Sequence, residues 1–332
     1  AAEVKSIALI GPFAEKAVTG GGGSSHVVPL YTINPPQGIR NVASVAKVEV
    51  DDGSDIAKAT ALARASDVAL VMVGMVDTEG RDHSLTLGDA QNKLVEAVAA
   101  ANRRTIVVLK TGSSVLMPWV DKVPAILEAW YPGEEDGNAV ADVLFGKVNP
   151  SGRLPITFPR ALEDVPASTP AQYPGEDGTA HYSEGVFVGY RHYDAKNITP
   201  LFAFGFGLSY TNFEYSNLRI SRKEIALSKP ETVTVAVTVK NTGKIAGAEV
   251  AQLYLGLPGN QIPEPPRQLK GFQKVVLRPG EAQRVRFQIK SRDLSFWDVK
   301  NHQWKISPGE VSVMLGSSSR QIRLSGKLRV GE

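Results

Sequence analysis

Apolar and polar positions follow two different patterns along this chain, and the pattern changes between about residues 160 and 212. In the first part, short continuous apolar runs alternate with segments whose apolar residues recur at helical spacing. Continuous runs are typical of strands buried on both faces, and strand–helix alternation predicts a mostly parallel sheet flanked by helices. The fold class expected here is therefore α/β, an α/β sandwich. The expected strands are 6–12, 45–50, 67–73, 105–110 and 125–129, and the expected helices are 56–65, 91–101 and 137–144.

The second part reads as an all-β domain. Its apolar residues alternate with polar ones in short segments that Gly, Pro, Asn and Asp turns separate, which fits a fibronectin type III-like or immunoglobulin-like sandwich. The stretch between the two parts is rich in Pro, Gly and Tyr, and its length predicts a connection that wraps over a surface. The expected division is 1–160 for the α/β sandwich, 161–212 for the connection and 213–332 for the β-sandwich.

Composition removes several classes of function. The chain has 332 residues and no cysteine, which excludes disulfides, thiolate metal sites and cysteine nucleophiles. A net charge of +3 without a basic run argues against nucleic acid as a partner, and the absence of a long apolar stretch argues against a membrane span. The compartment stays open, with a secreted or periplasmic location slightly favoured. Because the sequence starts almost directly in a strand, we expect a processed or dissected piece of a longer protein.

Two motifs invite a cofactor or metal interpretation, and neither supports one. The GGGGSS stretch at 20–25 lies some way beyond the first strand and lacks the spacing of the dinucleotide fingerprint. A flexible loop whose backbone N–H groups face a ligand fits it better. The five histidines are too dispersed for a metal site, so we expect neither metal nor cofactor.

Glu79 is the carboxylate that stands out. It follows the apolar run 68–73 and precedes Gly80, which allows a tight turn with a projecting side chain. Arg81, Asp82 and His83 can hydrogen-bond around such a turn. A solvated loop would look the same, so the residues alone leave the choice between a catalytic and a structural loop open.

A family resemblance bears on that choice. IALIGP, GGGSSHVVP, EGRD, VVLKTGSSVLMPW, AWYPGEEDGNAVADVLFGKVNPSGRLPITFP, YSEGVFVGYRHYD and PLFAFGFGLSY occur in an order that resembles the C-terminal portion of family 3 glycoside hydrolases, the β-glucosidase and β-xylosidase group. The resemblance covers essentially the whole chain. It implies an α/β sandwich followed by a fibronectin type III-like domain, normally preceded by a (β/α)8 barrel that carries the aspartate nucleophile and is missing from this chain.

The resemblance also implies roles for individual residues. Glu79 corresponds to the general acid/base of the family's E-G-x-D-R loop, with His83 where arginine is usual. Glu184 is the alternative glutamate, which we interpret as structural. Asp136 stands where a small residue is more common, which we expect to matter little. The residues expected to bind substrate or shape the site loops are Gly22, Gly23, Ser24, Arg81, Asp82 and His83.

The implied function is the acid/base part of a retaining β-glycosidase that hydrolyses terminal β-linked sugars. Its implied partners are the N-terminal barrel and a β-linked oligosaccharide or glycoside. The alternative is a non-catalytic scaffold or carbohydrate-binding module. Aromatic side chains could stack on sugar rings in such a module, although they more often lie in protein cores. The aromatic candidates are Trp119, Trp130, Tyr131, Trp297 and Trp304.

Overall fold

The chain forms two compact units, Ala1–Val148 and Asn149–Glu332. The computed structural model describes residues 4–44, 46–227 and 232–331. The predicted connection 161–212 falls within the second unit by its contacts. The domain limits near 160 and 212 stay a prediction. The first residue of the predicted strand 45–50, Val45, lies outside the described residues.

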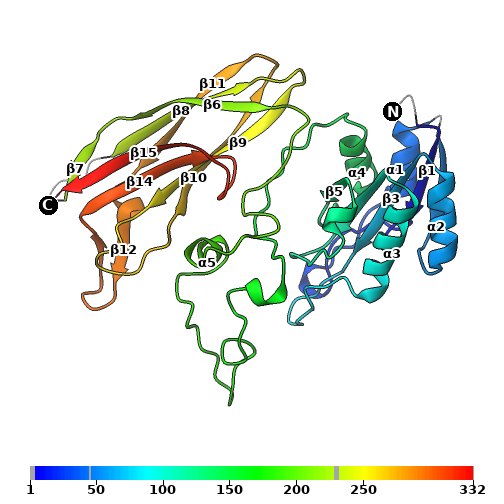
Figure 1. The fold of residues 1–332 in the computed structure, drawn as a ribbon, viewed down its shortest axis with the longest axis horizontal. Helices are drawn as coiled ribbons and strands as arrows, with labels where there is room; N and C mark the ends of the chain where they lie inside the picture. The colour runs from blue at the N-terminus through cyan, green and yellow to red at the C-terminus, as the bar shows by residue number, and fades with distance from the viewer. Residues whose placement is uncertain (1–3, 45, 228–231, 332) are drawn as a thin grey trace. The chain divides into compact units, whose positions relative to one another are not determined.

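The first unit is built on a five-stranded, wholly parallel sheet in the order β2-β1-β3-β4-β5 (Figure 1). Its central strands are almost fully buried, as their continuous apolar runs predict. The strands are β1 (Ser6–Ile10), β2 (Lys47–Asp51), β3 (Val68–Gly74), β4 (Thr105–Lys110) and β5 (Ala125–Glu128).

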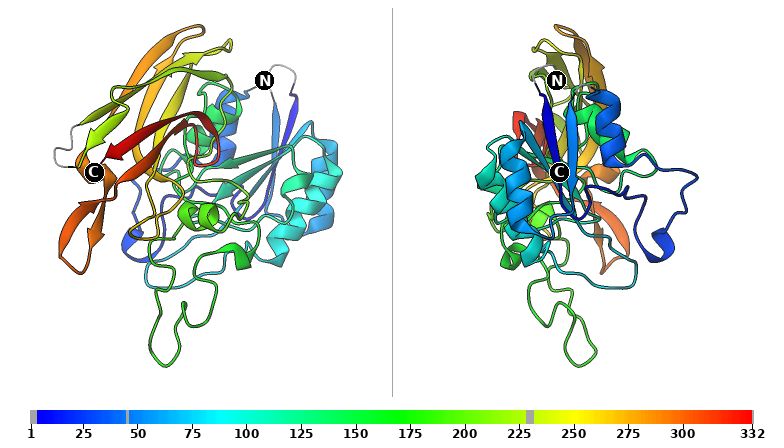
Figure 2. Two further views of the ribbon diagram at one scale, coloured as in Figure 1. Left: turned by 60° about the vertical axis from the view of Figure 1, so that its left-hand side comes forward. Right: turned by 90° about the vertical axis from the view of Figure 1, so that its right-hand side faces the viewer.

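Helices cover both faces of this sheet. One pair, α1 (Pro35–Val42) and α4 (Asp136–Leu144), packs together, and the other pair, α2 (Ile56–Ala65) and α3 (Asp89–Ala101), does the same on the opposite face (Figure 2). The expected α/β sandwich is therefore confirmed. A 3-10 turn, η2 (Val120–Lys122), lies between β4 and β5.

Local signals explain where these helices begin. The Asp55 carboxylate accepts hydrogen bonds from Ala57 N and Lys58 N and so caps α2. Helix α1 was not predicted, because PPQGIRNV contains two prolines and a central glycine. Its start nevertheless follows a known rule: the Asn34 side chain caps Gln37 N at 3.0 Å, and prolines occupy the first helical positions, where their missing N–H costs nothing.

The second unit contains a β-sandwich, which confirms the all-β expectation. One sheet has the order β10-β9-β14-β15-β7 and the other β11-β8-β6, and a separate hairpin pairs β12 with β13. The strands are β6 (Phe213–Ile220), β7 (Glu224–Ala226), β8 (Val233–Asn241), β9 (Gly247–Gly256), β10 (Gln268–Leu277), β11 (Ala282–Ile289), β12 (Ser295–Asp298), β13 (Gln303–Ile306), β14 (Gly309–Gly316) and β15 (Ile322–Gly331).

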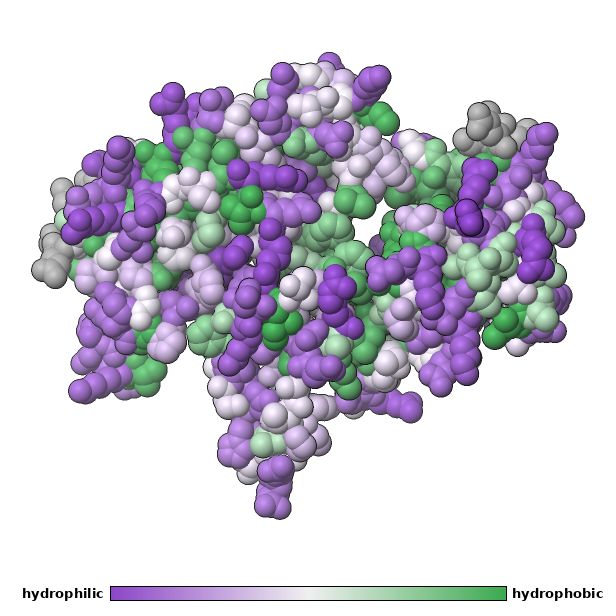
Figure 3. Space-filling model, viewed as in Figure 1, coloured by the Kyte–Doolittle hydropathy of each residue, from purple (hydrophilic) through white to green (hydrophobic). Residues whose placement is uncertain are grey.

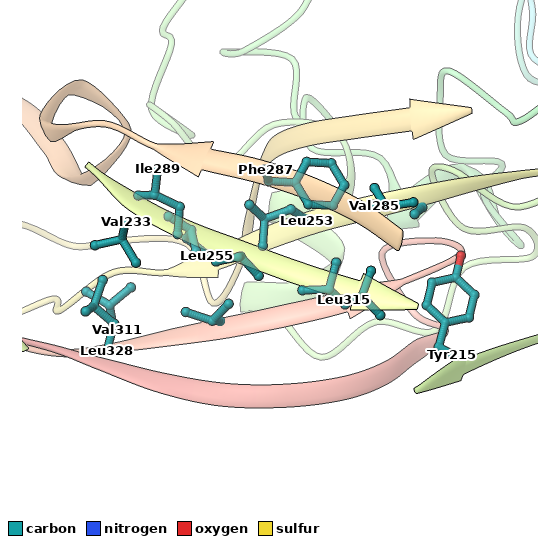
Figure 4. Packing of buried hydrophobic residues seen from close by; sticks show 14 of the residues in the cluster. Tyr215, Val233, Leu253, Leu255, Val285, Phe287, Ile289, Val311, Leu315 and Leu328 are labelled. Atoms are coloured by element: carbon teal, nitrogen blue, oxygen red, sulfur yellow. The ribbon is translucent and has the colours of Figure 1, made fainter. Parts of the chain in front are cut away.

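The sandwich core is made by the inward positions of both sheets. Val233 and Ile289 from one sheet pack against Leu253, Leu315 and Leu328 from the other (Figure 4). These side chains are almost completely buried, and each buried aliphatic side chain stabilises the fold by roughly 1.5–3 kcal/mol. The alternation of apolar and polar residues along each strand is what directs them to one side.

The segment before the sandwich is fixed to it by charge. Helix α5 (Tyr190–Ala195) carries Asp194, whose side chain is 1% exposed. Its carboxylate lies 3.0 Å from Arg267 Nε and 2.7 Å from Arg320 Nε. The remaining short helical turns are η1 (Gly23–Ser25), η3 (Leu162–Asp164) and η4 (Ser291–Leu294).

The surface is mixed in character. Polar side chains cover most of the face in Figure 3, with smaller apolar areas among them. Within residues 4–44, 46–227 and 232–331, no helix combines the length and the apolar composition that crossing a membrane would require.

Candidate active site

The strand order places two loops of interest side by side. In a parallel sheet ordered β2-β1-β3-β4-β5, β2 lies on one side of β1 and β3 lies on the other, so the strand order switches between β1 and β3. Ligands of such sheets bind beyond the carboxyl ends of the strands at this switch point. The loop after β1 (residues 11–34) contains the glycine stretch, and the loop after β3 (residues 75–88) contains Glu79. The topology thus brings both sequence motifs to one edge.

A tyrosine from the segment that follows β5 holds the first residues of the Glu79 loop. The Tyr131 hydroxyl donates to the Met75 carbonyl at 3.0 Å and accepts from Asp77 N at 2.8 Å. Gly112 lies against the same groups, since a Cβ there would come within 2.7 Å of the Tyr131 oxygen and of Asp77 Oδ2. Only glycine therefore fits at position 112 without displacement of these groups.

The glycine loop pairs directly with the Glu79 loop. Gly22 N donates to the Asp77 carbonyl at 2.8 Å, and Gly22 forms a parallel bridge with Thr78. Gly23 has φ +62°, and a Cβ there would lie 2.7 Å from Thr78 Oγ1. The close approach explains why glycines occupy both positions. These backbone contacts fix the residue immediately before Glu79.

Glu79 itself is exposed. Among the residues that the structure describes, none makes a hydrogen bond or an ion pair with its carboxylate. Gly80 follows with φ +74° and open space around it, so it turns the chain away. Ser24, Arg81 and Asp82 are exposed as well. The structure thus fixes the backbone on the N-terminal side of Glu79 and leaves its side chain facing solvent.

His83 lies at the end of the turn and faces its beginning. Its Nε2 is 3.7 Å from Asp77 Oδ2 and 3.4 Å from Ser113 Oγ, while Nδ1 lies 3.2 Å from the Ser84 carbonyl. Asp77 and His83 therefore flank the loop that carries Glu79. Of the residues predicted to shape the loop, Gly22, Gly23 and His83 contact its base, whereas Ser24, Arg81 and Asp82 do not within the described part of the chain.

A second carboxyl group lies nearby at the end of β5. Burial raises the pKa of Glu128 from its ordinary 4.5 to about 8. Hydrogen bonds from Trp130 N at 2.9 Å and Thr111 Oγ1 at 3.3 Å lower this pKa, but their effect is smaller than that of burial. Trp130 has φ +54°, a strained conformation for an aromatic residue and a feature common near functional sites. Burial thus favours the protonated form of the Glu128 carboxyl.

Several of these residues were not predicted. Asp77, Thr111, Ser113 and Glu128 come from three separate segments of the sequence and meet because β3, β4 and β5 end at one edge of the sheet. Their position at or just after the ends of predicted strands was the available signal. Glu184, the alternative glutamate, is half-buried and accepts a hydrogen bond from Gln172 Nε2 at 3.1 Å.

Comparison with known sequences identifies the family. The profile described as "Glycosyl hydrolase family 3 C-terminal domain" matches residues 1–190. The chain belongs to glycosyl hydrolase family 3. A fibronectin type III-like profile matches residues 249–319, in agreement with the β-sandwich.

Individual family 3 relatives are similar to this chain over most of its length. Thermostable beta-glucosidase B of Acetivibrio thermocellus is 42% identical over 98% of this chain. A beta-glucosidase of Rhizobium radiobacter is 45% identical over 81% of it. The chain spans 44% and 33% of the length of these two relatives. It therefore corresponds to part of a family 3 protein.

Solved family 3 structures share the fold. DesR, a beta-glucosidase from Streptomyces venezuelae crystallised with D-glucose, superposes with a TM-score of 0.92 at 33% identity, over 98% of this chain and 56% of that one. The beta-D-glucoside glucohydrolase of Trichoderma reesei gives 0.89 at 32% identity, over 99% and 52%. The similarity extends through both units of the chain.

Proposed function

We propose that this chain is the C-terminal part of a retaining β-glucosidase-type glycoside hydrolase and that Glu79 is its general acid/base. One observation carries the proposal: Glu79 is an exposed carboxylate, without a partner among the described residues, on a backbone that Gly22 and Tyr131 fix, at the sheet edge where α/β proteins bind ligands. A carboxyl group that must exchange protons with a substrate needs this combination of fixed position and free side chain.

The chemistry requires a second carboxyl group. A retaining glycosidase places a nucleophile about 5–5.5 Å from its acid/base. The nucleophile attacks the anomeric carbon while the acid protonates the departing oxygen; the same group then removes a proton from the incoming water. We assign the nucleophile to a (β/α)8 barrel that joins this chain in the complete enzyme. No metal or cofactor is needed for these two steps.

The surface beside the glycine loop supports a partner of this kind. Val28 and Leu30 are 79% and 94% exposed, and Val27, Tyr31 and Val76 are also more than half exposed. A cluster of apolar side chains around a polar site is typical of a surface that another domain covers. We propose that the barrel packs on this cluster and so encloses Glu79.

The substrate class follows from the family. Relatives of this chain are named beta-glucosidases, so we propose a terminal β-linked sugar of an oligosaccharide or glycoside as the substrate. In this site His83 shapes the Glu79 loop together with Gly22 and Gly23. The exposed Ser24, Arg81 and Asp82 are proposed to contact substrate or barrel.

The aromatic residues give little support to a carbohydrate-binding module. Trp119 is fully buried. Trp297 and Trp304 are tilted against each other across the β12–β13 hairpin, with the Arg292 guanidinium over the Trp304 ring. The two indoles are 42% and 46% exposed, but Arg292 covers one face of the Trp304 ring, which leaves less aromatic face for a sugar than the exposure alone indicates.

Activity with and without the barrel tests the proposal. Residues 1–332 alone should release nitrophenol from aryl β-glucosides at no more than a trace rate, because general acid catalysis alone contributes only ~10²–10⁴-fold. Addition of a separately expressed barrel from a family 3 relative, or expression as one chain with it, should restore turnover. The same mixture with Glu79→Gln is the control. Full activity of that control, or turnover by residues 1–332 alone, would contradict the proposal.

A further inference from the structure

A buried ion pair lies beneath the site loops. Lys110 is the last residue of β4 and Asp136 the first of α4, and their side chains are 0% exposed with Nζ and Oδ2 2.6 Å apart. Burying two charges carries a desolvation penalty that the ion pair often does not recover, and apolar residues of similar size are often as stable. Stability alone therefore does not account for the pair, and our expectation that Asp136 matters little was wrong in structural terms.

Asp136 also holds the loop after β1. Its Oδ2 accepts a second hydrogen bond from Val18 N at 2.7 Å, while Oδ1 is buried without a partner among the described residues. The segment around Asp136 makes further hydrogen bonds to the same loop, among them Gly133 N to the Val18 carbonyl at 3.1 Å and Ile33 N to the Glu134 carbonyl at 2.8 Å. The glycine loop is thus anchored on both sides of Gly22.

Lys110 contacts the other loop through its backbone. Its carbonyl accepts from Met75 N at 3.0 Å, at the point where the Glu79 loop leaves β3. The two loops then meet each other at Gly22 N and the Asp77 carbonyl. The Asp136 side chain therefore holds the glycine loop, and the main chain of Lys110 holds the start of the Glu79 loop.

We propose that Lys110 and Asp136 are positioning residues for the Glu79 carboxyl: the ion pair holds Asp136 where it fixes the glycine loop at Val18, and the contact of Gly22 with Asp77 transmits that position to the Glu79 loop. This inference rests on the proposed function for its catalytic consequence. Its structural part, the coupling of the two loops, can be measured in this chain without activity.

Paired substitution separates positioning from stability. Lys110→Met with Asp136→Leu removes both charges and the acceptor of Val18 N, while it keeps the volume, so the fold is expected to survive. Hydrogen exchange by NMR should show the Val18 and Gly22 amides exchanging at least about 10-fold faster, with the amides of β3 nearly unchanged. The matched control is Lys122→Met with Glu96→Leu, an exposed pair 2.7 Å apart that contacts neither loop and should change neither amide.

Unchanged exchange at Gly22 in the paired variant would overturn the proposal. If the paired variant does not fold, the unmodified chain decides: at low urea the Val18 and Gly22 amides must be protected together. A Gly22 amide that exchanges freely while Val18 stays protected would show that the two are not coupled, and would equally overturn it.

Leaving-group dependence tests the catalytic consequence in the complete enzyme with its barrel. A displaced acid affects poor leaving groups most, so kcat/KM of the paired variant should fall by about 10-fold or more for cellobiose but by less than about 3-fold for dinitrophenyl β-glucoside. Equal losses for both substrates would contradict positioning. If Glu79→Ala discriminates between the substrates and the paired variant does not, only the role of the pair fails; if Glu79→Ala itself does not discriminate, the proposed function fails with it.

Discussion

At the scale of single residues, the site contains carboxyl groups in three different environments. Glu79 is exposed and unpaired within the described residues, Asp136 is fully buried against Lys110, and Glu128 is partly buried with a raised pKa. Only the first of these can reach a substrate without a change in structure. The residue types give no hint of this difference, because each environment depends on which strand ends lie side by side.

The pKa of Glu128 gives a testable dependence of stability on pH. Burial raises that pKa from 4.5 to about 8, so between these values the folded chain holds a proton that the unfolded chain has released. Its contribution to the free energy of unfolding is complete below about pH 4.5 and declines as pH rises to about 8, by at most roughly 1.4 kcal/mol per pH unit.

Glu128→Gln removes this dependence. We expect the variant to gain stability relative to the wild type as pH rises from 5 to 8, measured by urea unfolding at each pH. The control is Glu96→Gln, an exposed carboxylate in the same unit, which should show no such trend. A constant difference between wild type and Glu128→Gln over this range would show that Glu128 is not buried as a neutral acid.

At the scale of elements, strands and helices whose apolar residues recur with a clear period could be predicted from the sequence. Elements that lack such a period could not. The helix 56–65 and the strand 105–110 have the bounds that the sequence predicts, because their apolar residues dominate the local pattern. Helix α1 has prolines and a glycine in place of such a pattern. Strand β10 carries exposed Phe272 and Val276 on its outer face, so its alternation is blurred.

In the candidate site, too, some residues could be predicted from the sequence and others could not. A resemblance in sequence singled out Glu79, Gly22 and Gly23, and the structure brings the glycines against the Glu79 loop. The partners Asp77 and Tyr131 could not be predicted, because their contact depends on the order β3-β4-β5 in the sheet, and the period of a strand does not reveal its neighbours.

The junction between β3 and the Glu79 loop offers a prediction at this scale. A Cβ at Gly74 would collide with the Lys110 carbonyl, a backbone atom that cannot move without shifting β4. Gly74→Ala should therefore lower the free energy of unfolding by about 3 kcal/mol or more. At Gly80, with φ +74° and open space, alanine should cost only about 1–2 kcal/mol.

Urea unfolding of the two variants checks this order. Gly152→Ala serves as the control, since a Cβ there meets nothing within 4 Å and its φ is not positive. We expect the control to change stability by less than about 1 kcal/mol. Equal losses for Gly74→Ala and Gly80→Ala would mean that the strand-to-loop junction tolerates a side chain and is less tightly packed than described.

At the scale of the whole molecule, the chain corresponds to part of a family 3 protein. Its α/β unit presents Glu79 on a supported loop, and its second unit adds a β-sandwich with its own core. The family 3 relatives are more than twice as long as the part that matches, which leaves room for the proposed barrel and its nucleophile. The proposed function therefore depends on one property of Glu79, that its carboxyl group acts first as acid and then as base.

Azide rescue of Glu79→Ala in the complete enzyme tests that claim most directly. With dinitrophenyl β-glucoside, the first step needs little acid, so the glycosyl-enzyme should form and accumulate, whereas its hydrolysis lacks a base. Azide needs no base, so it should accelerate turnover and yield β-glucosyl azide. Glu184→Ala, the control, should lower stability without rescue. Azide rescue of Glu184→Ala but not of Glu79→Ala would contradict the assignment.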